Sequence, residues 1–413
     1  MIRKAAIVFA LVWALVVTCL RSARLPNNFA TEHWLIDYRF GFVKRGLIGS
    51  VVAVATALGG TRPSEALIDA LSIVLFIVFC GAILWAGLRI VRRSGWSPGA
   101  TAVVLAFLSS PFVVMSAHLI GYYDDIVVIL TLTSLWLLFK RRPWAAAAVL
   151  SISVLVHENA LLIGLPVFAW ACWHVADDAR PEAATGSRWR RLLPAILPLA
   201  VFALLTVRLS TAPHRLERDL TAYLSTYPFV AGTIADVRVP HWITITFNDS
   251  YLLHRGHVQE RLLSQPMIAL VLPTLLALLG ALFEARATAA VSIESAIALV
   301  ICLVPESMHV MAWDTSRIWT YPIVSAFLLV WVDAELRPSK SATSQLVVLI
   351  SLVALVLNAI GVTPLMDGLR DRFDVTTRLL LYAPVMAIAA VVAGRSTAAG
   401  RSAKPSGERV TFG

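Results

Sequence analysis

The dominant pattern along the chain is a recurring run of apolar residues, each close to the length that crosses a lipid bilayer. A transmembrane helix needs about 20 mainly apolar residues. Runs of this kind repeat from one end of the chain almost to the other, separated by polar or basic connections. The pattern predicts an all-α, polytopic transmembrane bundle of about 12 spans, at residues 5–20, 66–88, 98–117, 126–139, 144–156, 160–176, 192–208, 266–283, 289–305, 318–332, 343–360 and 376–394.

The charges between these runs predict an orientation. Arg3 and Lys4 precede the first run, and clusters such as Lys140-Arg141-Arg142 fall in alternate connections. Cytoplasmic connections carry an excess of Lys and Arg, so both termini are expected in the cytoplasm. Residues 1–394 then form a single membrane domain with two long outer segments, 21–65 and 209–265. The small, polar and basic stretch 395–413 is expected to be a disordered cytoplasmic tail.

Two stretches fit this scheme poorly. Residues 46–60 are apolar but short and rich in Gly and Ala, and counting them as a span would reverse every later connection. We therefore expect a helix that lies at the outer interface or re-enters the membrane. Residues 144–176 are short for two full spans, which predicts a break near His157 and Glu158. Irregular backbone at membrane depth is tolerated only where it is buried in protein or lines a wet cavity, so this break marks a candidate site.

Composition excludes several classes of protein. Hydrophobic residues make up 58% of the chain and charged residues 15%, whereas a soluble domain carries about 25% charged residues. The net charge of +10 comes from short clusters between apolar runs, so we expect no nucleic-acid partner. The four cysteines lie within apolar runs and outside any CxxC or Cys/His cluster, at positions 19, 80, 172 and 302. That placement indicates neither a disulfide framework nor a zinc site.

The first outer segment carries the densest polar pattern. After Asp37, the cations Arg39, Lys44 and Arg45 alternate with aromatic residues and glycines. Glycines allow close backbone approach, and cations beside them suit a phosphate group. The stretch therefore predicts contact with a phosphate-bearing membrane lipid, with a solvated interfacial loop as the plainer alternative.

Two further outer turns carry acidic residues. Asp124 and Asp125 begin a predicted helix, where carboxylates also complement the helix dipole. Because the two are adjacent, they point to different helix faces and at most one is expected to enter a cavity. His157 and Glu158 lie between apolar runs, where an unpaired charge is costly. They are either a functional pair or a structural pair between helices, and Leu161 in place of a second His disfavours a metalloprotease.

A last outer cluster precedes the span at 318–332. Asp314 and Arg317 are three residues apart, as are Glu306 and His309, so each pair can share one helix face. The alternative for Asp314 and Arg317 is an ion pair at the membrane boundary. All of these clusters fall on the predicted outer side, which places any chemistry there.

These motifs resemble the GT-C class of membrane glycosyltransferases, in which an outer acidic residue follows the first helix and many spans come after it. More narrowly, residues 41–47, His157-Glu158 and residues 314–319 resemble features of bacterial membrane proteins near the EpsG-like polysaccharide assembly group. The resemblance covers the architecture of most of the chain but only these short motifs in sequence. The GT-C pattern often carries paired acids in the first outer loop, where Asp37 here stands alone with Glu32 five residues earlier.

The resemblance implies transfer of a sugar from a polyprenyl-phosphate donor to a glycan or lipid-linked acceptor, at the outer face of a bacterial plasma membrane. Asp37 would be the general base, a step typically worth about 10²–10⁴-fold, and His157 and Glu158 would orient the sugar or supply a second acid/base. The candidates for binding the lipid phosphate are Arg39, Lys44, Arg45 and Arg317. The candidates for binding sugar or acceptor are Asp124, Asp125, His309 and Asp314. The implied mechanism requires no cofactor and no metal, but it is compatible with a divalent metal ion.

A transporter or flippase for an anionic or lipid-linked substrate is the alternative. Twelve spans with both termini inside is a common transporter plan, but the two halves show no convincing internal repeat of the kind many transporters carry. The polar residues also gather at one face instead of following a path across the membrane, which favours the enzyme.

Overall fold

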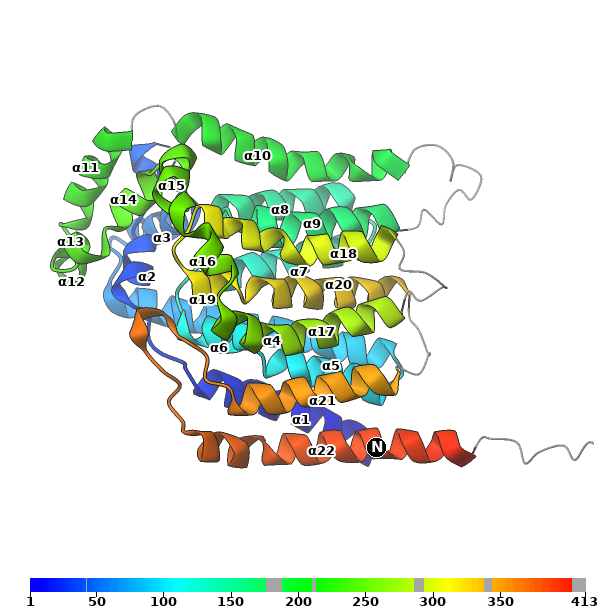
Figure 1. Cartoon of the computed structure of the whole chain (residues 1–413). Helices are drawn as coiled ribbons and strands as arrows, with labels where there is room; N and C mark the ends of the chain where they lie inside the picture. The colour runs from blue at the N-terminus through cyan, green and yellow to red at the C-terminus, as the bar shows by residue number, and fades with distance from the viewer. Residues whose placement is uncertain (42, 176–187, 210–212, 286–292, 338–343, 403–413) are drawn as a thin grey trace, which may run out of the picture.

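The protein is an all-α helical bundle. A computed structural model describes residues 1–41, 43–175, 188–209, 213–285, 293–337 and 344–402. The chain is 81% helical and the described residues contain no strand. Figure 1 shows the long helices lying along a common direction, with a group of short helices at one end. The all-α class predicted from the apolar runs is confirmed.

Each predicted span overlaps a helix of this bundle. Eight segments are long and apolar enough to cross a membrane. They are formed by α1 (Ile2–Leu20), α4 (Glu65–Arg93), α5 with α6 (Pro98–Leu108, Pro111–His118), η3 with α10 (Arg188–Leu192, Leu193–Leu209), α17 (Gln265–Glu284), α18 with η5 (Ile293–Leu303, Val304–Val310), α19 with α20 (Thr315–Ile318, Tyr321–Leu336) and α22 (Val375–Ser402). Four shorter helices complete the bundle, α7 (Asp124–Phe139), α8 (Pro143–Val156), α9 (Ala160–His174) and α21 (Gln345–Ile360).

The short helices gather at one end, which we call the site end. Two segments supply most of them, the one that follows α1 and the one that joins α10 to α17 (Figure 1). They are α2 (Asn28–His33), η1 (Tyr38–Phe40), α3 (Gly46–Leu58), α11 (Pro213–Leu224), α12 (Pro228–Ala231), α13 (Ile234–Val237), α14 (Val239–Thr244), α15 (Phe247–His254), η4 (Arg255–His257) and α16 (Val258–Leu262), with η6 (Met366–Gly368) before α22.

Local sequence signals explain where the bundle helices begin and break. The Ser64 side chain caps α4 by accepting a hydrogen bond from the Leu67 backbone N–H at 3.3 Å, which satisfies an N–H that has no partner inside the helix. Ser97 caps α5 in the same way, and Pro98 follows it at the position where proline fits a helix start. Pro111 begins α6 after the interruption at Ser109 and Ser110. These breaks leave α5 and α6 as two short helices inside one span.

The centre of the bundle is closed by apolar packing. The segment formed by α5 and α6 is buried over its whole spanning length. Phe107 of α5 and Phe327 of α20 stack with ring centroids 3.7 Å apart. In contrast, Val74 and Ile77 of α4 are 55% and 63% exposed. A large exposed apolar surface is expected where a helix faces lipid, so the outside of the bundle suits a bilayer.

A buried ion cluster ties α1, α21 and α22 together at the site end. Asp371 Oδ2 lies 2.6 Å from the guanidinium groups of both Arg21 and Arg378. The second positive charge is balanced by carbonyl groups at the end of α21, since Arg21 donates to the Asn358 carbonyl at 2.7 Å and Arg378 donates to the Ile360 carbonyl at 3.0 Å. A helix C-terminus carries partial negative charge. The terminal guanidinium nitrogens that make these contacts all bind protein groups, so we assign the cluster a structural role.

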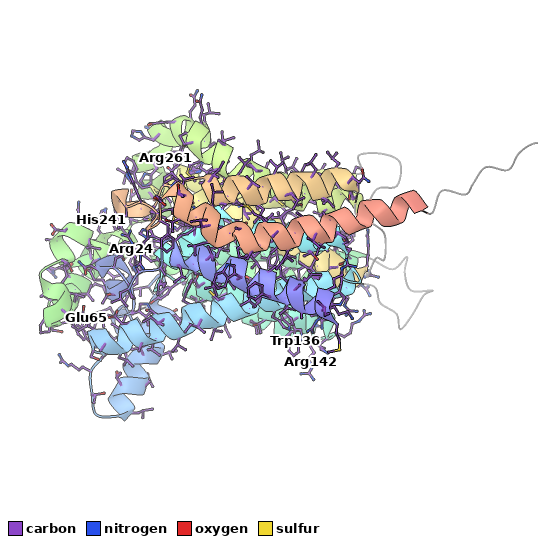
Figure 2. All side chains as sticks on the ribbon, turned by 90° about the horizontal axis from the view of Figure 1, so that it is seen from below. Arg24, Glu65, Trp136, Arg142, His241 and Arg261 are labelled. Carbon is purple, nitrogen blue, oxygen red and sulfur yellow. The ribbon has the colours of Figure 1, made fainter. Side chains whose placement is uncertain are left out.

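Two of the doubtful stretches can be compared with the structure. Helix α3 covers 13 residues of the stretch 46–60, and Figure 2 shows the helix that leads to Glu65 lying across the direction of the bundle helices. The predicted break in 144–176 is present, since α8 ends at Val156 and α9 begins at Ala160. Helix α22 is described as far as Ser402, and the expected disorder of the tail over 395–413 stays a prediction. Residues 403–413 lie outside the described residues.

Candidate functional site

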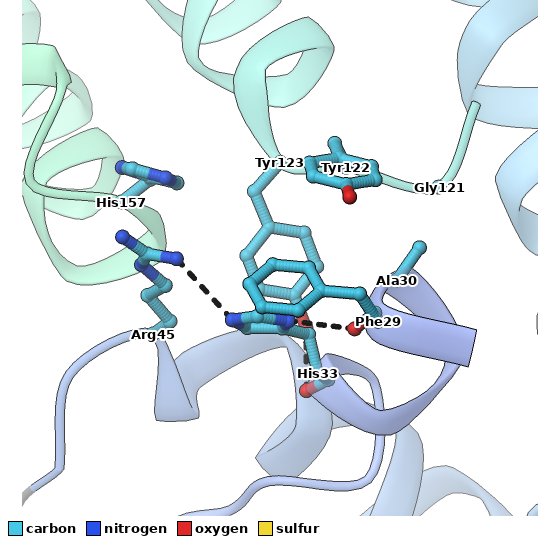
Figure 3. Close-up of a pocket in the computed structure, with 8 residues that line it drawn as sticks. All are labelled: Phe29, Ala30, His33, Arg45, Gly121, Tyr122, Tyr123 and His157. Atoms are coloured by element: carbon cyan, nitrogen blue, oxygen red, sulfur yellow. Dashed lines mark hydrogen bonds between the residues drawn. The ribbon is translucent and has the colours of Figure 1, made fainter. Parts of the chain in front are cut away.

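A pocket at the site end brings together three segments that are distant in sequence. Figure 3 shows its lining, which comes from the first outer segment (α2 and Arg45 before α3), from the turn before α7 and from the break between α8 and α9. The lining residues are Phe29, Ala30, His33, Arg45, Gly121, Tyr122, Tyr123 and His157. The cavity volume is about 10 Å³, and about 210 Å³ of empty space lies between the lining atoms when the part that opens to solvent is included. The pocket has an aromatic wall and a basic floor.

Two glycines place Arg45 on the pocket floor. Arg45 directly precedes α3, and a Cβ on Gly49 would lie 1.9 Å from the Ile36 carbonyl oxygen. A Cβ on Gly46 would lie 2.6 Å from the Tyr38 ring. Only glycine permits this approach, so α3 can pack directly against the backbone of the first outer segment. Arg45 itself has φ of 61°, in the left-handed region that non-glycine residues seldom adopt.

The Arg45 side chain is held by a carboxylate and a histidine. Its guanidinium donates two hydrogen bonds to Glu158, at 2.5 Å and 3.1 Å. A third hydrogen bond runs from Arg45 to His33 Nε2 at 3.2 Å. The Arg45 and Glu158 side chains are 18% and 22% exposed. A two-point pair of this kind fixes both the position and the plane of the guanidinium.

The partners of the two histidines fix their protonation. His33 Nδ1 lies 2.7 Å from the Phe29 carbonyl oxygen and must donate to it, so Nε2 is the acceptor from Arg45. Burial, together with the nearby Arg45 charge, lowers the pKa of His33 to about 3, so His33 is neutral. His157 Nδ1 accepts from the Asn159 backbone N–H at 3.0 Å. A neutral His157 therefore carries its proton on Nε2, as a donor on the pocket side.

A second ion cluster adjoins the break between α8 and α9. Asp124 Oδ1 accepts hydrogen bonds from the Asn159 amide at 2.9 Å and from the Tyr321 hydroxyl at 3.0 Å. Arg317 lies between two carboxylates, 3.4 Å from Asp124 and 2.7 Å from Asp314. The guanidinium of Arg317 is also 5.5 Å from the centroid of the Tyr122 ring, a pocket wall. This cluster thus connects α7, α9 and α20 to the pocket.

Six of the predicted site residues therefore belong to one connected group. Arg45 and His157 form the floor and Glu158 binds Arg45, while Asp124, Arg317 and Asp314 form the adjoining cluster. Three further members that were not among the predicted site residues are His33, Asn159 and Tyr321. Their sequence signals are weak, because a histidine in a short helix or a tyrosine at a span boundary is common in membrane proteins.

The other predicted residues lie elsewhere. Asp37 caps η1 and binds its own neighbour Arg39, whose guanidinium is 2.8 Å away and stacks over Tyr223. Lys44 donates to the Ile245 carbonyl at 2.7 Å, and burial lowers its pKa to about 8.

Asp125 and His309 also face away from the pocket lining. Asp125 interacts with Ser116 and Cys80, so of the two adjacent carboxylates only Asp124 reaches the connected group. His309 Nε2 lies 3.0 Å from Glu306 in η5. Within the described residues, no group of three or more His, Cys, Asp or Glu is arranged to hold a metal ion.

Comparisons with known proteins leave the family open. No protein-family model matches the chain, and no curated protein is significantly similar to it. The function must therefore be argued from the site.

Proposed function

We propose that the chain is a membrane glycosyltransferase that moves a sugar from a polyprenyl-phosphate donor to a glycan or lipid-linked acceptor. In this proposal the chain crosses a bacterial plasma membrane twelve times with both termini in the cytoplasm, and the site end faces outward. The observation that carries the proposal is the pocket, where hydrogen-bond donors on the floor meet aromatic rings on the wall (Figure 3).

The floor has unused donors for an oxygen-rich ligand. A guanidinium has five N–H groups, and Arg45 uses three of them on Glu158 and His33. The remaining two, together with the His157 Nε2–H, can donate to phosphate or sugar oxygens. Because Glu158 holds the guanidinium in place, little ordering is needed when a ligand binds. A leaving phosphate would gain negative charge beside these donors, which is the electrostatic requirement of the reaction.

The wall suits a sugar ring. Phe29 and Tyr122 stack with centroids 5.5 Å apart, and Tyr123 donates its hydroxyl to the His33 carbonyl at 2.9 Å. Aromatic faces pack against apolar ligand surfaces while a few polar groups fix orientation, which is the usual composition of a small-molecule site. Ring faces and donors line the same pocket, so their chemistry suits a ligand that carries both a sugar and a phosphate, and the pocket must widen to admit it.

The geometry favours Glu158 over Asp37 as the carboxylate that removes the acceptor proton. Each carboxylate is paired with an arginine, Asp37 with Arg39 and Glu158 with Arg45, but Asp37 is 3% exposed and its arginine lies outside the pocket lining. Glu158 is more exposed, and it touches the pocket floor through Arg45. In the proposed mechanism Glu158 takes the proton of the acceptor hydroxyl, His157 donates to a sugar oxygen, and Arg45 stabilises the leaving phosphate.

The packing below the pocket supports an enzyme more than a transporter. A transporter needs a route that can open between the two membrane faces. Here the stacked rings of Phe107 and Phe327 lie in the centre of the bundle, and the buried face of α20 from Ile323 to Val332 is almost wholly apolar. The connected group of polar residues lies at the site end of the bundle, where a reaction at one surface of the membrane would take place.

A transfer assay tests the proposal. Purified protein in lipid vesicles receives radiolabelled polyprenyl-phosphate sugars and a membrane-extracted acceptor fraction. We expect label to move to the acceptor with the wild type and to be lost with Glu158→Gln. Donor movement between leaflets without any transfer would favour the transporter instead.

A further inference from the structure

Two of the four cysteines lie on different helices and have side chains that face each other. Cys19 of α1 and Cys80 of α4 are 61 residues apart in sequence, and their sulfur atoms are 3.8 Å apart. The other two, Cys172 of α9 and Cys302 of α18, are buried. Because all four thiols lie in apolar runs, their spacing in sequence gave no sign of this pairing. The contact depends on how α1 packs against α4.

The pair lies where a reagent from the site end can reach it. Cys19 is the second-last residue of α1, whose site-end terminus is followed by Arg21 and Ser22. Both sulfur-bearing residues are partly exposed, unlike Cys172 and Cys302. The buried carboxyl of Asp125 also interacts with Cys80.

We propose that Cys19 and Cys80 form a redox-active pair that is oxidised to a disulfide by a thiol-oxidising partner at the site end. The oxidant is itself a disulfide: one cysteine sulfur attacks it, a mixed disulfide forms, and the second cysteine sulfur then displaces the remaining thiol. Two protein thiols are oxidised, one oxidant disulfide is reduced to two thiols, and the atoms balance. The sulfur atoms need to approach from 3.8 Å to about 2 Å for the bond to form.

The disulfide between residues 19 and 80 would restrain the pocket wall that the turn at Gly121 forms. The turn at Gly121 packs between the chain that follows α1 and helix α4, since a Cβ there would lie 3.0 Å from Pro26 and 3.1 Å from Ser72. A disulfide between α1 and α4 restrains the two elements that hold this turn. Outward-facing compartments are oxidising enough to keep such a bond. The chemistry of the pair does not rest on the proposed sugar transfer.

The experiment counts thiols. Folded protein in lipid is treated with dithiodipyridine, a membrane-permeable disulfide, and then denatured and alkylated with N-ethylmaleimide. We expect the number of alkylated cysteines in each chain to fall from the four present to two. Peptide mapping by mass spectrometry should find residue 19 linked to residue 80 within one chain.

Matched variants separate this pair from random oxidation. Cys80→Ser should prevent the internal bond, so that any Cys19 that reacts keeps a mixed disulfide with the reagent and no bond within the chain is found. Cys302→Ser should still lose two thiols to the bond between residues 19 and 80. Four alkylated cysteines in the oxidised wild type would overturn the proposal. Bonds that join two chains, or that involve Cys172 or Cys302, would also overturn it, and the wild-type peptide map decides even if a variant fails to fold.

Discussion

The substitution Arg45→Lys tests whether the pocket floor depends on the shape of a guanidinium and not only on its charge. Arginine makes three hydrogen bonds here, two to Glu158 and one to His33. A lysine keeps the positive charge but has no planar fork, so it can replace about one of the three. Two hydrogen bonds from a charged group are then lost, each worth about 1.5 kcal/mol at the low end.

The expected loss is about 2–3 kcal/mol, because the pair is largely but not fully shielded from solvent. A loss of this size in donor binding lowers the affinity by about 30- to 150-fold. We would measure it by titrating the protein in lipid nanodiscs with a short-chain polyprenyl-phosphate sugar, and by following thermal unfolding of the same samples.

Arg39→Lys is the matched control. Arg39 also forms a pair with an aspartate, but its side chain is 48% exposed and it lies outside the pocket lining. Exposed pairs contribute about 0.2–1 kcal/mol, so this variant should bind donor almost as the wild type does. Equal losses for the two variants, or no loss for Arg45→Lys, would refute the reasoning about the pocket floor.

Three further variants give independent tests. Burial raises the pKa of Glu32 to about 7 although the Thr233 hydroxyl donates to it. The folded state therefore holds a proton that the unfolded state releases above pH 4.5, and wild-type stability falls as the pH rises from 4.5 to 7. Glu32→Gln should remove this fall, so thermal unfolding should show a gain of at most about 3 kcal/mol at pH 8 and none at pH 4; a constant gap would contradict the assignment. Gly49→Ala should prevent α3 from packing on the Ile36 carbonyl and cause misfolding in a detergent size-exclusion assay, whereas Gly81→Ala, with open space at its Cβ, should elute as wild type does. Asp124→Asn removes the charge that pairs with Arg317 and should lower the unfolding temperature more than Asp125→Asn does. The reverse order would mean that Asp125, and not Asp124, belongs to the connected group.

The apolar runs predicted most of the fold because a bilayer constrains helix length so strongly. Every predicted span overlaps a helix, and the short stretch at 46–60 forms a separate helix that lies across the bundle (Figure 2). The predicted break in 144–176 is also present, since α8 ends at Val156 and α9 begins at Ala160.

The site was predicted less completely, for reasons that depend on packing. His157 and Glu158 stood out because charge between apolar runs is costly, and their position in the group agrees with that reasoning. Asp37 stood out equally, yet in the structure it binds Arg39 two residues away. A local pair of this kind has the same sequence signature as a catalytic acid. His33 and Tyr321 could be recognised as members of the connected group only from the structure, because the segments that carry them are far apart in sequence.

The most direct measurement of the central claim is sugar transfer by three forms of the protein in parallel. Wild type, Glu158→Gln and Asp37→Asn would be supplied with the same radiolabelled polyprenyl-phosphate sugars and acceptor fraction. The account predicts transfer by the wild type, a loss of at least about 100-fold in Glu158→Gln, and substantial activity in Asp37→Asn. Transfer that survives in Glu158→Gln but disappears in a folded Asp37→Asn protein would contradict it and move the reaction away from the pocket.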